Sequence, residues 1–186
     1  MGQFLVILNS EMSMREPGSM PDALITALNR EPPEAFMQAL SASEWQSDDV
    51  DRDGFPLLFR AVDQNRLDIA ELLVRAGAQV DRREPNGWTT LFWATLNGQE
   101  DAVAFLLRFG ADPNFESEDG ERALMIPAWK GFTTIARLLL AHGAQHDAVK
   151  ADGLTAIAVA AARGQACVVE ALGAAAAQAE KTRPIH

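Results

Sequence analysis

Two histidines and the single cysteine are the residues best suited to act as nucleophile, base or metal ligand. His142 and His146 are four residues apart, a spacing that can bind zinc when both side chains lie on one helix face. Gly143 lies between them and is expected to end a helix, and no Glu separates them as a metalloprotease pattern requires. Cys167 has apolar neighbours and no nearby His, so we expect a small buried side chain. The sequence therefore predicts no catalytic residues, no metal site, no cofactor and no enzyme activity.

The charge of the chain restricts its partners. The 186 residues carry a formal net charge of −10, with a sequence pI of about 4.7. An acidic surface repels nucleic acid and anionic membranes, so neither is expected as a direct partner, whereas a basic protein is compatible. Solubility alone is the alternative explanation of the charge.

Acidic residues gather in two groups. Arg52 is the basic residue close to the first group, and Arg122 the one close to the second. The groups are Asp48, Asp49, Asp51 and Asp53, and Glu116, Glu118, Asp119 and Glu121. Such groups would steer a basic partner and speed its association, unless they form only a solvated edge.

Glycines recur along the chain at a constant step of 33 residues. The three series are Gly54, Gly87, Gly120 and Gly153, each after Asp or Asn; Gly77, Gly110 and Gly143, each before Ala; and Gly98, Gly131 and Gly164, with Asn65 in the first copy. Two short apolar helix patterns lie between the glycines of each copy. Helices this short are unstable alone in water, so the copies must stack on one another.

With these motifs the chain resembles the ankyrin repeat family. The matching segments are Gly-Trp-Thr-Thr-Leu-Phe-Trp-Ala from Gly87, Leu-Leu-Arg-Phe-Gly-Ala-Asp-Pro-Asn from Leu106, and Gly-Leu-Thr-Ala-Ile-Ala-Val-Ala from Gly153. The resemblance covers residues 51–176. It implies an all-α solenoid of stacked helix-turn-helix units with β-turn tips and with N- and C-terminal capping repeats. It leaves the function open, because one fold hosts many functions.

The chain divides into a tail, a cap and four repeats. We expect residues 1–19 to form a disordered or loosely docked tail, and residues 20–50 to form a capping helix pair. The four repeats are expected at 51–83, 84–116, 117–149 and 150–178, followed by a disordered tail over 179–186. Whether translation starts at Met1, Met14 or Met20 stays open.

Pro127 interrupts the pattern of the third repeat. It occupies the position where the other copies carry Ala61, Ala94 and Ala160. A proline inside a helix removes a hydrogen bond and clashes with the preceding turn. We expect either a distorted helix or one that begins late, with Pro127 in its first turn.

The resemblance implies that partners bind at the turn tips and at the exposed side of the first helix of each repeat. The partner-binding residues expected on that basis are Asp53, Phe55, Asp63, Trp88, Leu96, Glu118, Asp119, Glu121 and Trp129. Phe55, Trp88 and Trp129 are large aromatic residues of the kind that anchor interfaces. The alternative is that a ring folds back on its own turn. Trp93 is expected in the core between repeats.

Two functions follow from these features. The first is a non-enzymatic interaction module that binds a basic protein through a concave acidic and aromatic face, in the manner of an inhibitor or immunity protein blocking a nuclease-like cleft. The second is a constitutive scaffold that holds an enzyme complex together.

The location and the free state of the protein are also expected from the sequence. One cysteine excludes an internal disulfide. A signal peptide has basic residues before its apolar run, and the short apolar run over 4–8 has none. We expect a cytoplasmic protein that is monomeric when free.

Overall fold

The computed structural model describes residues 22–43, 45–118, 120–149 and 153–182. Within these residues the helices come in consecutive pairs, and the only pairing of extended backbone is in isolated bridges. The chain divides into two compact units, Met1–Asn86 and Gly87–His186. The predicted tail over 1–19 lies outside the described residues.

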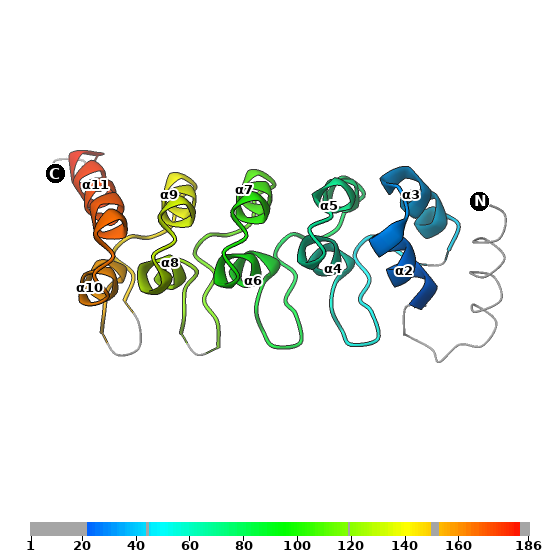
Figure 1. Ribbon diagram of the computed structural model, residues 1–186, viewed down its shortest axis with the longest axis horizontal. Helices are drawn as coiled ribbons and strands as arrows, with labels where there is room; N and C mark the ends of the chain where they lie inside the picture. Colours follow the sequence, from blue (N-terminus) through cyan, green and yellow to red (C-terminus); the bar gives the residue numbers. More distant parts are fainter. Residues whose placement is uncertain (1–21, 44, 119, 150–152, 183–186) are drawn as a thin grey trace. The chain divides into compact units, whose positions relative to one another are not determined.

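The described residues of the first unit form two helix pairs (Figure 1). The first pair is α2 (Asp22–Arg30) and α3 (Pro33–Ser41), and the second is α4 (Leu57–Asp63) and α5 (Leu67–Arg75). Helix α3 packs against both α2 and α5. Arg66, just before α5, joins the two pairs: its Nη1 donates to the Leu28 carbonyl at 2.7 Å and its Nη2 to the Glu31 carbonyl at 2.9 Å. These bonds satisfy carbonyl oxygens at the end of α2, which the helix itself cannot satisfy.

The second unit contains three helix pairs: α6 (Thr90–Leu96) with α7 (Glu100–Arg108), α8 (Met125–Lys130) with α9 (Thr133–Ala141), and α10 (Ala156–Ala162) with α11 (Ala166–Thr182). The first helices contact one another in the order α6, α8, α10, and the second helices in the order α7, α9, α11. The second unit therefore has its helices in two layers, as Figure 1 shows. The apolar face between the layers is fully buried, with Leu91, Leu106, Ile135, Leu139 and Leu172.

Threonine begins two of the first helices. Thr89 Oγ1 accepts a hydrogen bond from the Phe92 N–H, and Thr155 Oγ1 accepts one from the Ala158 N–H, both at 3.3 Å. Each side chain thereby satisfies a backbone donor in the first helical turn. The two residues lie 66 positions apart, which is twice the repeat step.

The glycine series mark left-handed backbone. Every glycine of the three series has a positive φ, and Asn65 is the non-glycine with positive φ in the described chain, at 55°. Asparagine tolerates this conformation better than most residues, which explains why it can replace glycine there. At Gly98 (φ 70°) glycine is needed for a second reason: a Cβ atom would lie 3.0 Å from the Phe132 ring of the next repeat.

Pro127 lies in the first turn of a helix that begins late. Helix α8 starts at Met125, whereas α6 starts at Thr90, the counterpart of residue 123 one repeat later. Pro127 is thus the third residue of α8. A backbone N–H at this position has no acceptor within the helix, so its absence in proline costs no intrahelical hydrogen bond. Of the two outcomes left open by the sequence, the late start is the one adopted.

The last helix is longer than the others. Helix α11 covers 17 residues and continues through Gly173 to Thr182. The tail expected over 179–186 therefore begins inside a helix, because the alanine-rich sequence favours helix beyond the end of the repeat. Residues 183–186 lie outside the described part of the chain.

Candidate functional site

The residues with catalytic potential form no reactive arrangement. His142 follows α9, and its Nδ1 lies 2.9 Å from the Leu138 carbonyl oxygen, so the ring is bonded to its own helix. Cys167 is exposed, so the prediction of a buried side chain was wrong. It is the second residue of α11, in the last helix pair, and no later helix follows in the described residues to cover it. Among those residues, no group of three His, Cys, Asp or Glu side chains is arranged to hold a metal ion.

In the first unit, the sequence placed Asp53, Phe55 and Asp63 in the binding site. The Phe55 ring stacks on Phe59 at a centroid distance of 4.7 Å, and the Arg60 guanidinium carbon lies 4.8 Å from the Phe55 centroid. Phe55 is therefore half-buried against helix α4, which follows it directly. This agrees with the alternative that an aromatic ring folds back on its own repeat. Asp63, at the end of α4, is also half-buried.

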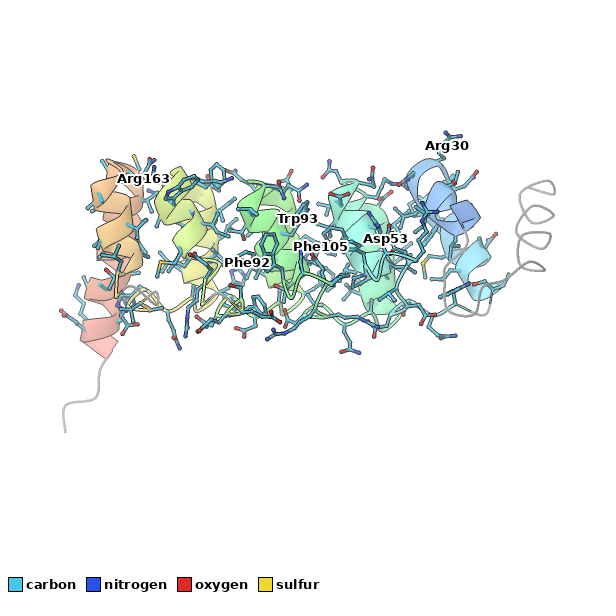
Figure 2. All side chains as sticks on the ribbon, turned by 90° about the horizontal axis from the view of Figure 1, so that it is seen from below. Arg30, Asp53, Phe92, Trp93, Phe105 and Arg163 are labelled. Carbon is cyan, nitrogen blue, oxygen red and sulfur yellow. The ribbon has the colours of Figure 1, made fainter. Side chains whose placement is uncertain are left out.

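Three residues of the acidic group in the first unit pair with arginines more distant in the sequence than Arg52. Asp51 is buried and forms an ion pair with Arg60 at 2.5 Å, and Asp53 (Figure 2) pairs with the same guanidinium at 3.1 Å. Asp48 Oδ2 lies 2.8 Å from Arg82 Nη1. This region therefore offers a basic partner less unpaired negative charge than the sequence suggested.

Trp88 is the first predicted site residue of the second unit. It is half-buried, with its ring centroid 5.2 Å from that of Phe92 and 6.3 Å from that of Trp93. Figure 2 labels Phe92 and Trp93 on α6. Trp93, expected in the core, is half-buried as well. Trp88 is thus part of an aromatic cluster that packs on its own helix.

Trp129 differs from the other two aromatic residues because 49% of its surface is exposed. It is the next-to-last residue of α8. The Arg163 guanidinium carbon lies 4.5 Å from its ring centroid, a distance typical of a cation–π contact. Arg163 caps the C-terminal end of α10 and is labelled in Figure 2.

Beside Trp129 is a hollow of ≈ 230 Å³, here called the Trp129 groove. Its lining comes from α6, α8, α10 and the turn before α8: Leu96, Glu121, Met125, Ile126, Trp129, Lys130 and Val159. Lys130 Nζ crosses one side of it to donate to the Leu96 carbonyl at 2.8 Å. The groove brings together Leu96, Glu121 and Trp129, three of the nine residues that the sequence placed in the site.

Glu118 lies at a turn tip. Glu118 is exposed, and a Cβ atom on Gly87 would lie 3.3 Å from its carboxyl group, so the two turns approach closely. Glu116 pairs with Arg122 at 2.8 Å. Asp119 lies outside the described residues.

Sequence reasoning missed the apolar floor of the groove, which is formed by Met125, Ile126 and Val159. A signal for two of these residues exists, because Ile126 and Val159 are 33 positions apart and so share one position of the repeat. The same holds for Leu96 and Trp129, and for Lys130 and Arg163. The lining is thus built from a few repeat positions that recur on neighbouring helices.

The chain was compared with known proteins. A family model described as ankyrin repeats (3 copies) matches residues 24–117, 58–150 and 91–184. The matches begin within α2, so they include the helix pair that the sequence analysis treated as a separate cap. A comparison with curated protein sequences found no match. In the described residues no helix combines the length and the apolar character needed to cross a bilayer.

Proposed function

Because the chain belongs to the ankyrin repeat family, with the all-α fold class of a repeat solenoid, we propose that it binds a protein partner through the Trp129 groove. Ankyrin repeats are protein-interaction modules, and members of the family are generally not enzymes. The observation that carries the proposal is the exposed Trp129 ring at the edge of an apolar hollow. Half-exposed tryptophans beside apolar pockets are frequent anchors of protein interfaces.

The greater exposure of Trp129 supports it, and not Trp88, as the anchor of the proposed interface. The half-buried Trp88 ring contacts Phe92 and Trp93, so its removal would lose packing inside the repeat. The Trp129 ring has solvent on one side and Arg163 on another. Binding energy is concentrated in residues that are exposed in the free protein and buried in the complex. Trp129 is the more exposed of the two rings in the free protein, which supports its role as the anchor.

The test combines Trp129→Ala with a control of similar exposure. The tagged full chain is used to isolate its partner, and the dissociation constant of the purified pair is then measured by calorimetry. We expect Trp129→Ala to weaken binding about 30-fold and to leave thermal stability unchanged. Val149→Ala, which truncates an apolar residue 56% exposed and outside the groove, is expected to bind as the parent does. Equal affinity of Trp129→Ala and the parent would exclude the groove as the docking site.

Trp88→Ala provides the complementary measurement. We expect it to lower the free energy of unfolding by about 2 kcal/mol, because it removes a ring from an aromatic cluster. Urea denaturation followed by circular dichroism would measure the change. A stability equal to that of the parent, together with a loss of partner binding, would move the anchor from Trp129 to Trp88.

The net charge of −10 supports a more specific form of the proposal, in which the partner is basic and the protein inhibits it, as an immunity protein inhibits a nuclease. The alternative is a constitutive scaffold. An inhibitor steered by charge should associate more slowly as salt is raised, because salt screens the long-range attraction. Stopped-flow association at about 0.05 and 0.5 M salt separates the two, since a scaffold with an apolar interface should show little change.

A further inference from the structure

The two ends of the Trp129 groove carry opposite charge. Glu121 precedes α8, whereas Lys130 ends it, and Arg163 lies over the Trp129 ring beside it. Helix α8 runs between these two ends and is about 9 Å long, because it has six residues at a rise of about 1.5 Å per residue. Between them the floor is apolar, with Met125 and Ile126 largely buried beneath it.

Lys130 and Arg163, at the basic end of the groove, have N–H donors that could bind a partner. Lys130 has three donors and directs one of them at the Leu96 carbonyl. The Arg163 guanidinium carbon lies 4.5 Å from the Trp129 ring centroid, and within the described residues the guanidinium N–H groups make no hydrogen bond. In the described residues neither cation forms an ion pair, whereas Arg60, Arg66 and Arg82 each pair with an aspartate.

The volume of the groove indicates the kind of occupant. Sites for drug-sized ligands have volumes of about 300–1,000 Å³, so ≈ 230 Å³ is small for one of them. It suits an apolar side chain with its flanking backbone. A carboxylate close to that side chain would meet the N–H donors of Lys130 and Arg163, and such charge-assisted bonds are stronger than neutral ones.

We infer that the Trp129 groove takes a partner segment in which an apolar side chain is flanked by carboxylates, with the carboxylates at the Lys130 and Arg163 end. This inference rests on the proposed function and adds the chemistry of the bound segment. It is compatible with a partner that is basic overall, because net charge acts on the encounter at long range while these two cations act at contact.

The experiment uses labelled ten-residue peptides and the full chain. Each peptide has one Leu, Met or Phe in a glycine-serine background, flanked by two Glu, two Gln or two Lys. Fluorescence polarisation measures binding. We expect the Glu peptides to bind at least about tenfold more tightly than the matched Gln and Lys peptides. Equal binding of the three sets, or no binding above the glycine-serine background, would overturn the inference.

Variants then locate the effect in the groove. Arg163→Glu and Lys130→Glu should each reverse the preference toward Lys peptides. Arg137→Glu, which changes an exposed residue of α9 outside the groove lining, should preserve it. An equal effect of Arg137→Glu would show that net charge is responsible and would overturn the inference.

The same measurements keep this inference separate from the proposed function. A natural partner that needs Trp129 but shows no preference for Glu peptides would leave the proposed function standing and remove the inference. Glu peptides that bind Trp129→Ala as tightly as they bind the parent would remove the inference, whereas only a natural partner that binds the two proteins equally would remove the proposed function. A second copy of this chain in the groove would appear in sedimentation as a dimer that Trp129→Ala dissociates, and this result would also overturn the inference.

Discussion

Asp51, Glu84 and Ser117 occupy the same repeat position, three residues before a turn glycine, and all three are buried. Asp51 Oδ1 accepts hydrogen bonds from the N–H groups of Asp53 and Phe55, both at 2.9 Å, and Ser117 Oγ accepts one from the Glu121 N–H at 3.1 Å. The position thus stabilises the turn when it holds a short side chain with an acceptor oxygen.

Glu84 fits this position less well. Its Oε1 is buried and has no hydrogen-bond partner in the described residues, and Asn86 Nδ2 donates to its Oε2 at 3.4 Å. Burial, reinforced by the charge of Asp63, raises the pKa of Glu84 to about 7, against the opposing effects of the Asn86 hydrogen bond and the charge of Arg60. Between pH 4.5, the ordinary pKa of this carboxyl group, and about pH 7, Glu84 is therefore protonated in the folded state and ionised in the unfolded state.

The way in which stability depends on pH follows from the number of protons that the folded and the unfolded state bind. Below pH 4.5 both states are protonated and Glu84 has no effect on stability. Between pH 4.5 and about 7 the free energy of unfolding falls, because the folded state binds more protons than the unfolded state. Above that range the loss is constant and on the order of 3 kcal/mol.

Glu84→Gln should therefore be more stable than the parent at pH 8 and about equal to it at pH 4.5, as measured by urea denaturation at the two pH values. Asp51→Asn is the matched control, and we expect it to be less stable than the parent at pH 8. It weakens the ion pair with Arg60 and should lower stability by about 1–3 kcal/mol. A parent stability that does not change between pH 4.5 and 8 would contradict the assignment.

At the scale of the element, a helix tolerates proline only near its start. Pro127 is the third residue of α8, and the two residues before the helix form a turn instead of extending it. Ala94 is at the same repeat position, but it is the fifth residue of α6 and fully buried. The late start of α8 is therefore the adjustment that accommodates Pro127.

Pro127→Ala should change the free energy of unfolding by less than about 1 kcal/mol, because no intrahelical hydrogen bond depends on that nitrogen. Ala94→Pro should cost about 3 kcal/mol or more, because it removes a hydrogen bond within α6 and adds bulk to a buried site. Chemical denaturation of both variants gives the comparison. A loss of 3 kcal/mol in Pro127→Ala would show that the proline stabilises the start of α8 in a way that this account omits.

At the scale of the whole molecule, each helix pair depends on its neighbour in the chain. In the first unit, Arg66 connects the first pair to the second through the carbonyls of Leu28 and Glu31. Its hydrogen bond to Asp68 also lowers the pKa of that carboxyl group. Stability in such an array is a sum of local terms, so the loss of one connection should remain local.

Arg66→Ala should accelerate amide hydrogen exchange in α2 and α3, because two carbonyl oxygens lose their partner, and should leave α8 to α11 unchanged. Mass spectrometry of the exchanged peptides would show the pattern. Arg75→Ala is the control, since it removes only an exposed pair with Glu71 on the same helix. Uniform acceleration along the whole chain would indicate a single cooperative unit and contradict the prediction.

The sequence by itself determined the helix pairs. The 33-residue glycine period determined where helices α4 to α10 end, because left-handed backbone is favourable for glycine and tolerable for Asn65. The start of α6 is equally local, because Thr89 Oγ1 accepts a hydrogen bond from the Phe92 N–H three residues later. Helix ends and caps depend on residues close together in the chain, so a single sequence is enough to predict them.

Only the tertiary structure decided which side chains remain available for binding. Arg82 meets Asp48, Lys130 meets Leu96 and Arg163 meets Trp129, each across 34 residues, so these contacts form between neighbouring repeats. They depend on how repeats stack and on which rotamer each side chain adopts, and the repeat period fixes neither. The same packing folds Phe55 and Trp88 onto their own helices and leaves Trp129 exposed beside an apolar hollow.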